Sequence, residues 1–524
     1  MEAVPHIAID GLTVRYRAKQ TSVLAIDGVS IDIPPRSFVS IVGPSGCGKT
    51  TLLKVLSGVL KPSSGRVTID GAPLDAAAVA GRIGYVFQRP LLLPWRTALQ
   101  NVALTCEIAR KAIGRDARLE DARKWLALTG LTGFEDRLPH ELSGGMQQRV
   151  SLSRALAFQP PILMMDEPFA ALDEITREAM QDELLRLWSM TESTVIFITH
   201  SISEGRAAVR ARRRDDGAAR PGRRRDRSAV PAAARRSAAR QPGIQRAGPG
   251  HSSTAAGQPT RDGELIMLRL LSRTAGQIGV FIAFFVAWEA LVDTLGIKPV
   301  ILPAPSVIFL TIGKHWAYLA QHSWPTFLAV GGGFLLAAVT GFVIAIGIAY
   351  SRWISELTYP FLVAAQVLPK IAFAPLFLIW FGFGLTPKVV IAALIAFFPI
   401  VINTARGLTS VEPELVQYMR SLGAAWHEVF FKLSLPWALP YIFASFKISI
   451  TLAVVGAVVG EFVASDSGLG YVISYANISL ETELMFAGIF VLSALGLAFF
   501  LAVVLCERLT LSWQAAIEST PETM

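Results

Sequence analysis

The chain has 524 residues, enough for several domains that each bury a hydrophobic core of their own. Hydrophobic residues make up 52% of it and the mean hydropathy is +0.46, which excludes an ordinary soluble protein. The formal charge of +9 arises in one segment, because residues 205–262 contain 15 Arg and 4 Asp, with no Lys or Glu. The remainder is slightly acidic, so the basic balance does not indicate a nucleic-acid partner.

The first part of the chain, residues 1–204, alternates short apolar runs with helical stretches. We expect a helix from Thr50 and buried strands at 39–42, 82–87, 162–165 and 194–199. Apolar strands that alternate with helices predict an α/β domain with a largely parallel sheet. The first 20 residues lack the apolar core of a secretory signal, so this part is expected to stay in the cytoplasm. Three widely separated cysteines, Cys47, Cys106 and Cys506, are expected to be small buried thiols in a reducing compartment.

A phosphate-binding loop follows the first of the parallel strands. Residues 43–50 read Gly-Pro-Ser-Gly-Cys-Gly-Lys-Thr. The glycines let backbone N–H groups approach phosphates closely, Lys49 supplies charge to the β- and γ-phosphates, and Thr50 offers a hydroxyl to Mg²⁺. The sequence therefore predicts an ATP site.

Polar side chains stand where three further strands end. Asp166 and Glu167 follow the strand 162–165, Gln88 follows 82–87, and His200 follows 194–199. The carboxyl ends of parallel strands converge on the nucleotide in an open α/β sheet. Asp166 is placed to hold Mg²⁺ and Glu167 to polarise the attacking water. The alternatives are an ordinary acidic strand end and a structural histidine.

The segment Leu142-Ser143-Gly144-Gly145-Met146-Gln147-Gln148 completes a set of motifs that resembles the nucleotide-binding domain of ABC transporters over residues 5–204. The resemblance implies catalytic roles for Glu167, His200 and Gln88. It also implies Mg²⁺ ligands at Thr50, Gln88 and Asp166. Its ATP contacts would be Tyr16, Gly43, Pro44, Ser45, Gly46, Cys47, Gly48, Lys49, Thr50, Thr51, Ser143, Gly144, Gly145 and Gln147.

Two of these implied contacts have a particular geometry in that family. Tyr16 would stack on adenine; the alternative is a strand aromatic packed within the sheet. Ser143, Gly144 and Gly145 would cap the γ-phosphate held on the P-loop of a second copy, since a helix N-terminus with glycines receives phosphate well. One such domain per chain therefore implies a homodimer with composite sites.

The segment 205–266 differs in composition from both flanking parts. It is rich in Arg, Ala, Gly and Pro, and residues 205–262 contain three large aliphatic residues and no aromatic. Such a stretch buries too little apolar area to fold, so we expect a disordered linker. In the ABC family the ATPase continues beyond this point. A frameshift near codon 205 that fused two adjacent genes is one interpretation, with Met267 as the start of the second; a genuine basic linker is the other.

The last part, residues 267–524, carries the membrane signal. Apolar stretches occur near 277–295, 326–350, 371–385, 389–405, 440–462 and 485–506. These predict about six transmembrane helices, since roughly 20 apolar residues span a bilayer. With the N-terminus inside, the loop 463–484 lies outside and contains no Lys or Arg, as the positive-inside rule prefers.

The loop between the fourth and fifth stretches resembles the cytoplasmic coupling loop of ABC importer permeases. Gly423 and Leu435-Pro436 stand at the family's spacing, whereas Gln417-Tyr418-Met419 departs from its Glu-Ala-Ala pattern. The alternative is an interfacial helix without a partner. Residues 369–384 and Asp466–Gly470 resemble permeases for nitrate, sulfonates and taurine. The charged residues within or beside spans, which could face a solute path or simply reach the interface, are Glu289, Lys370, Lys447 and Glu461.

The sequence thus predicts an ABC-type α/β P-loop NTPase domain (1–204), a linker (205–266) and an all-α permease domain (267–524). The expected function is ATP-driven import of a small, anionic solute across the bacterial cytoplasmic membrane, with the ATPase on the cytoplasmic side. Expected cofactors are ATP and Mg²⁺; expected partners are a second copy, an external solute-binding protein and membrane lipid, and no nucleic acid. The alternatives are an inactive frameshift fusion and an ABC exporter.

Overall fold

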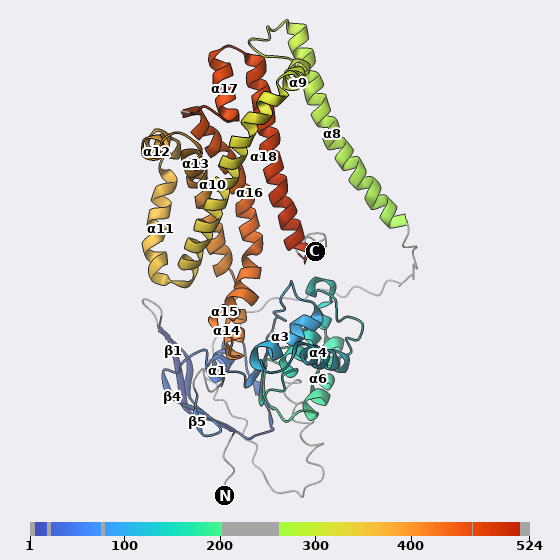
Figure 1. The fold of residues 1–524 in the computed structure, drawn as a ribbon. Coiled ribbons are helices and arrows are strands. Elements are labelled where there is room, and N and C mark those ends of the chain that lie inside the picture. Colours follow the sequence, from blue (N-terminus) through green and yellow to red (C-terminus); the bar gives the residue numbers. More distant parts are fainter. Residues whose placement is uncertain are drawn as a thin grey trace, which may run out of the picture. The chain divides into compact units, whose positions relative to one another are not determined.

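The computed structural model describes residues 6–17, 22–74, 79–170, 172–201, 261–463 and 465–513 (Figure 1). The proposed linker and the frameshift position near codon 205 lie outside these residues. The chain divides into two compact units. One comprises Met1–Gly217, Leu319–Val472 and Phe490–Met524, and the other comprises Ala218–Tyr318 and Ile473–Ile489. The first unit therefore contains both the ATPase elements and most of the apolar helices.

A parallel sheet forms the centre of the ATPase part. Its order is β3 (Phe38–Val42), β8 (Thr194–Thr199), β7 (Ile162–Asp166) and β6 (Ile83–Val86). All three neighbouring pairs are parallel, as the apolar runs predicted, and every residue of β6 and β8 is buried. The carboxyl ends of these strands share one edge of the sheet. This edge is where the predicted site residues lie.

A second, antiparallel sheet was not predicted from the sequence. Its order is β2 (Ser22–Ile33), β1 (Ile7–Arg17), β4 (Ser64–Ile69) and β5 (Ala72–Pro73). One face of β1 is buried, with Ile7, Ile9, Leu12 and Val14 in the core. Register shifts between Ile9 and Val14 break the strict alternation of apolar and polar residues, which obscures the period-two signal.

The ATPase helices begin at residues whose chemistry favours a helix start. Thr97 and Gln100 form a capping box, while Ser143 and Asp173 accept from the backbone N–H groups of Met146 and Thr176. These three N-cap residues precede α3, α5 and α6. The helices are α1 (Lys49–Leu56), α3 (Ala98–Ala109), α4 (Arg115–Leu128), α5 (Gly144–Leu156) and α6 (Glu174–Ser189).

The regular elements of the permease part are all helices among the residues that the structure describes. Its elements are α8 (Arg261–Leu295), α9 (Pro305–Lys314), α10 (Trp316–Tyr350), α11 (Arg352–Val367), α12 (Ala374–Phe381), α13 (Leu385–Thr409), α14 (Pro413–Ser421), α15 (Trp426–Val429), α16 (Leu435–Val463), α17 (Leu469–Ile478) and α18 (Thr482–Thr510). A 3-10 turn, Lys370–Phe373, precedes α12, and a π-helical turn, Phe430–Ser434, joins α15 to α16.

The number of membrane-spanning helices is lower than the six that the apolar stretches predict. Among the described residues, four helices are long and apolar enough to cross a membrane, and a fifth span results if a bent pair counts as one. That pair is Arg352–Val367 with Lys370–Phe381, bent by 88°. It stands in place of the single span expected near 371–385, because Pro369 disfavours a helix at Leu368 before it and lacks the N–H group that would continue the helix. The first expected span, 277–295, lies within α8 and is not among the four.

Small residues bring α13 and α16 into close contact. A Cβ atom added at Gly456 would lie 2.7 Å from Cα of Ala392, and one added at Gly460 would lie 3.1 Å from Cα of Lys388. Close approach through glycine and alanine is typical of packing between membrane helices. Lipid tails are as apolar as the side chains, so the hydrophobic effect contributes little to helix association and van der Waals contact contributes more.

The charged residues Glu461 and Lys388 are buried and hold the turn before α17. The Glu461 carboxylate accepts hydrogen bonds from Thr326 Oγ1 at 2.8 Å and from the Gly470 backbone N–H at 2.7 Å. Lys388 Nζ donates to the Ser467 carbonyl at 2.8 Å. The two charges are 1% and 2% exposed, so each hydrogen bond replaces water that burial removed. Glu461 is thus bound within the fold.

Replacement of Gly468 by alanine is expected to destabilise this turn. Gly468 has φ +113°, and an added Cβ would lie 2.2 Å from Cδ of Glu461. Strain and clash together should lower the free energy of unfolding by about 2 kcal/mol or more. Thermal unfolding of the full chain in detergent measures this. Gly496→Ala is the control, because its Cβ would meet Val454 at an ordinary 3.7 Å. Equal stability of the two variants would contradict the role of the turn.

Candidate functional site

The phosphate-binding loop has two glycines in backbone conformations that other residues rarely adopt. Gly48 has φ +96° and caps α1, and a Cβ added there would lie 2.3 Å from the Ala25 carbonyl oxygen. Gly46 also has a positive φ, at +81°. The loop therefore leads directly into the N-terminus of α1, where unpaired backbone N–H groups attract anions.

The three cysteines differ in their exposure. Cys47 is exposed in this loop and Cys506 is exposed in α18, whereas Cys106 is buried. The expectation of three buried thiols was therefore wrong for two of them.

The side chains of Lys49, Glu167 and His200 meet beside this loop. Lys49 Nζ donates to the carbonyl oxygens of Gly43 and Pro44 at 2.8 and 2.9 Å, and lies 3.6 Å from Glu167 Oε1. Glu167 Oε2 lies 3.3 Å from His200 Nδ1. Glu167 has φ +46°, and its backbone N–H donates to the Ile198 carbonyl at 2.9 Å. A non-glycine residue held in this conformation stores strain that the hydrogen bond helps to maintain.

The three oxygen-bearing residues predicted for Mg²⁺ line a single cavity. Thr50, Asp166 and Gln88 all line the same space. Burial raises the pKa of Asp166, and the nearby Thr50 hydroxyl only partly offsets this. A buried carboxylate with hydroxyl and amide oxygens nearby is a donor set that fits Mg²⁺, whose charge would compensate the desolvated carboxylate.

The residues predicted to contact adenine and a second copy's phosphate lie in two places. Tyr16 is 42% exposed on β1, with its hydroxyl 3.4 Å from Thr51 Oγ1, so its ring is not packed within the sheet. Ser143 caps α5 through Met146 N–H. The Gln147 side chain donates to the carbonyls of Pro139 and Leu142 at 2.9 and 3.2 Å, so it supports the loop before the signature. Ala171, in the loop after Glu167, is outside the described residues.

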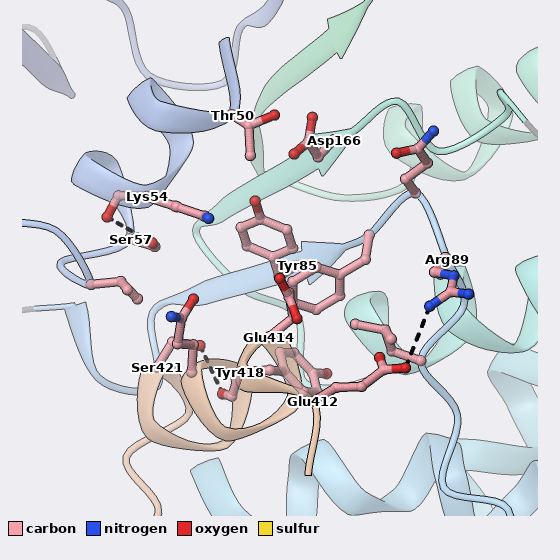
Figure 2. Close-up of a pocket in the computed structure, with 15 residues that line it drawn as sticks. Thr50, Lys54, Ser57, Tyr85, Arg89, Asp166, Glu412, Glu414, Tyr418 and Ser421 are labelled. Carbon is pink, nitrogen blue, oxygen red and sulfur yellow. Dashed lines mark hydrogen bonds and ion pairs between the residues drawn. The ribbon is translucent and has the colours of Figure 1, made fainter. Parts of the chain in front are cut away.

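The cavity beside Asp166 has a wall from the permease part. It measures about 390 Å³ and extends from Thr50 and Asp166 to residues of α14 and the turn before it. Figure 2 shows Glu412, Glu414, Tyr418 and Ser421 opposite Thr50 and Asp166. A backbone hydrogen bond from Gly81 N–H to the Ser421 carbonyl, 2.9 Å, fixes α14 to the ATPase. The segment Pro413–Ser421 thus lines one side of the ATPase cavity, so this helix is not without a partner.

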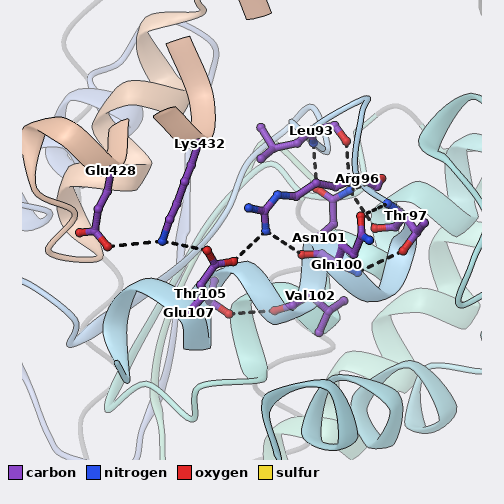
Figure 3. A network of polar contacts seen from close by, with 10 residues as sticks. All are labelled: Leu93, Arg96, Thr97, Gln100, Asn101, Val102, Thr105, Glu107, Glu428 and Lys432. Carbon is purple, nitrogen blue, oxygen red and sulfur yellow. Dashed lines mark hydrogen bonds and ion pairs between the residues drawn. The ribbon is translucent and has the colours of Figure 1, made fainter. Parts of the chain in front are cut away.

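A row of alternating charges forms a second contact between the ATPase part and the permease part. Lys432 Nζ lies 2.8 Å from Glu107 Oε1 and 3.4 Å from Glu428 Oε1, and Arg96 Nη1 lies 2.9 Å from Glu107 Oε2 (Figure 3). Lys111 Nζ is 2.6 Å from Glu428 Oε2. Burial would raise the pKa of Glu107, but hydrogen bonds from Lys432 and Arg96 outweigh it and the pKa lies below its ordinary value. Sequence reasoning missed this row, because the partners are more than 300 positions apart.

Two family models match the chain. One, described as ABC transporter, covers residues 26–170, and the other, described as binding-protein-dependent transport system inner membrane component, covers residues 337–511. Over 198 residues the chain is 44% identical to the Uncharacterized ABC transporter ATP-binding protein MJ0412 of Methanocaldococcus jannaschii, covering 73% of that relative and 38% of this chain. The chain belongs to the ABC transporter family. It is therefore an ABC ATPase, of a kind whose ATP hydrolysis drives transport, joined to an importer-type permease, and the exporter alternative is set aside.

Further similarities concern the ATPase part of this ABC transporter. The Taurine import ATP-binding protein TauB of Rhizobium johnstonii is 48% identical over 199 residues, which are 74% of that relative and 38% of this chain. A solved structure, the ATP-binding cassette MJ0796 bound to ADP and Pi in a dimeric, post-hydrolysis state, is 36% identical and has a TM-score of 0.36. That match covers 38% of this chain and 90% of that one.

Reversal of the Lys432 charge is expected to weaken the contact between the two parts. Lys432→Glu would place three carboxylates together at partly buried positions and should lower the free energy of unfolding by about 1–3 kcal/mol. The double variant with Glu107→Lys should recover part of the loss. Because the pKa of Glu107 is lowered, its contribution is present at neutral pH and is lost only as the pH falls through that lowered pKa. Thermal unfolding of the full chain measures the effect.

The control for this experiment is Lys61→Glu, a charge reversal at an exposed position of the ATPase part. It should change the free energy of unfolding by no more than about 0.5 kcal/mol. If Lys432→Glu had an effect as small as this control, the charged row would not stabilise the contact.

Proposed function

We propose that this ABC transporter imports a small anionic solute, taurine or a related sulfonate, across the bacterial cytoplasmic membrane. The observation that carries the proposal is that a permease segment forms one wall of the ATPase cavity, so that nucleotide chemistry and helix movement share one site. The 48% identity to a relative named for taurine import supports the solute class. In this proposal the ATPase lies on the cytoplasmic side, where it contacts α14.

The roles of the chain's own residues follow from their positions. The P-loop N–H groups and Lys49 hold the phosphates of ATP. Thr50, Asp166 and Gln88 would hold Mg²⁺, which would supply positive charge beside the transferred phosphoryl group. Glu167 orients and polarises the attacking water, and His200, 3.3 Å away, holds the Glu167 carboxylate in place. Tyr16, Thr51 and the remaining loop residues complete the nucleotide contacts.

Two copies of the chain form the working transporter. Each chain carries one P-loop and one signature segment, and the α5 N-terminus with Ser143, Gly144 and Gly145 is suited to a phosphate. The proposal assigns that phosphate to ATP held by the second copy. An external solute-binding protein delivers the solute, and membrane lipid surrounds the apolar helices.

Glu167→Gln tests this function. The amide keeps the size of the side chain but cannot act as a base, so ATP hydrolysis by the purified chain should fall by about 10²–10⁴-fold while ATP still binds. Uptake of radiolabelled taurine by cells carrying the variant gene in place of their own copy should be lost. Glu178→Gln, an exposed position on α6, is the matched control and should retain both activities. Unchanged taurine uptake in the Glu167→Gln strain would refute the solute assignment.

A second candidate is an inactive fusion that arose by frameshift near codon 205. The observation in its favour is that the chain covers 73% and 74% of its ATP-binding relatives, so about a quarter of each is unmatched. Resequencing of the locus distinguishes the two. Separate ATPase and permease reading frames would support the fusion, and one intact frame would refute it.

A further inference from the structure

A buried arginine of the signature helix joins the ATPase to the permease segment. Arg154 on α5 is 0% exposed, and its two terminal nitrogens donate to the carbonyls of Leu91 and Pro90 at 2.7 and 2.8 Å. Its Cζ lies 4.9 Å from the centroid of the Tyr418 ring on α14. Among the described residues no carboxylate pairs with it and its Nε has no hydrogen-bond partner. The carbonyls and the aromatic face are thus what compensates a fully desolvated charge.

The segment that Arg154 holds begins at Gln88. Leu91, whose carbonyl accepts from Arg154, has φ +45°, which is a strained conformation for a residue with a branched side chain. A second α5 side chain, Gln148, donates to the Phe87 carbonyl at 3.3 Å. Residues 87–91 are therefore fixed at both ends by α5. Without these bonds the segment would relax, and Gln88 would no longer be held beside Thr50 and Asp166.

The aromatic cover is a feature of this chain's own permease segment. Tyr418 stands where the importer pattern has its first alanine, and an alanine would leave the guanidinium face bare. Its ring is 2% exposed and also contacts Phe87 edge to face, with ring centroids 5.7 Å apart. The Tyr418 hydroxyl has no hydrogen-bond partner among the described residues. The ring, and not the hydroxyl, therefore carries the contact.

We propose that Tyr418 is a positioning residue for ATP hydrolysis, which acts through Arg154 on residues 88–91. The ring excludes water from the guanidinium, so the Arg154 donors stay on the carbonyls of Pro90 and Leu91 and keep Gln88 at the cavity. A cation–aromatic contact in a desolvated site is strong enough to matter here. The role of Tyr418 in ATP hydrolysis rests on the function proposed above for Gln88. The contact by which Tyr418 and Arg154 hold residues 88–91 does not depend on that function.

Hydrogen exchange of the full chain in detergent, without nucleotide or solute, tests the link. Tyr418→Ala should raise amide exchange in peptides covering residues 87–93 by about tenfold, and Tyr418→Phe should leave it at the wild-type level. Trp426→Ala is the matched control, because Trp426 is 75% exposed on the same permease loop. Unchanged exchange at 87–93 in Tyr418→Ala would overturn the proposal. So would increased exchange across residues 426–434 as well, since Tyr418 would then be a general docking anchor.

A double variant and a kinetic measurement separate positioning from simple destabilisation. Arg154→Lys keeps a charge but loses the two-pronged contact, so it should raise exchange at 87–93 like Tyr418→Ala, and the two changes together should add little. In ATP hydrolysis, Tyr418→Ala should lower kcat about three- to tenfold with KM for ATP unchanged, and Tyr418→Phe should restore it. Additive exchange effects, or a loss confined to KM, would overturn the proposal. If the wild-type chain hydrolysed no ATP, the proposed function would be refuted. The hydrogen-exchange measurement would still show whether Tyr418 and Arg154 hold residues 87–93 in place.

Discussion

The structure depends on one apolar contact, in which a permease segment completes the ATPase core. Buried side chains of α14 and the residues around it, among them Leu415, Met419 and Leu422, belong to the same hydrophobic cluster as the ATPase sheet. Full burial of one such side chain contributes about 1.5–3 kcal/mol. This burial is not directional, so it holds the two parts together without fixing their alignment. The alignment is set by the polar contacts at its rim.

Those polar contacts differ in how much of each side chain is exposed to solvent. Arg154 is fully buried and has only carbonyls and a ring as partners, so any displacement exposes an uncompensated charge. The Lys432–Glu107 pair is about one quarter exposed, and Arg89–Glu412 at 3.4 Å is further exposed still. The inner contact therefore resists movement strongly, whereas the outer pairs can shorten, lengthen or exchange partners with little cost. An interface of this kind can pivot without separating.

How much the sequence predicted depends on how local each signal is. The P-loop, Asp166 and Glu167 were found because the parallel strands are continuous apolar runs and their ends meet at one edge. The antiparallel sheet was missed because irregularities in β1 break its alternation. Helix α11 was missed since its continuous apolar run, residues 361–365, is short and Pro360 lies within the helix. Tyr418 was noticed as part of a departure from a pattern, but its contact with Arg154 was not predicted, because the two residues are far apart in sequence and no periodicity links them.

The position of Arg154 and Tyr418 in a single chain has a consequence for inheritance and assembly. Translation of a single chain produces the two halves in a one-to-one ratio. Covalent attachment also turns docking into an intramolecular event with a high effective concentration. Contacts too weak to recruit a free subunit are then sufficient. A change at residue 154 and a compensating change at residue 418 can pass together to descendants, and the pair can drift away from the pattern of transporters whose subunits are encoded apart.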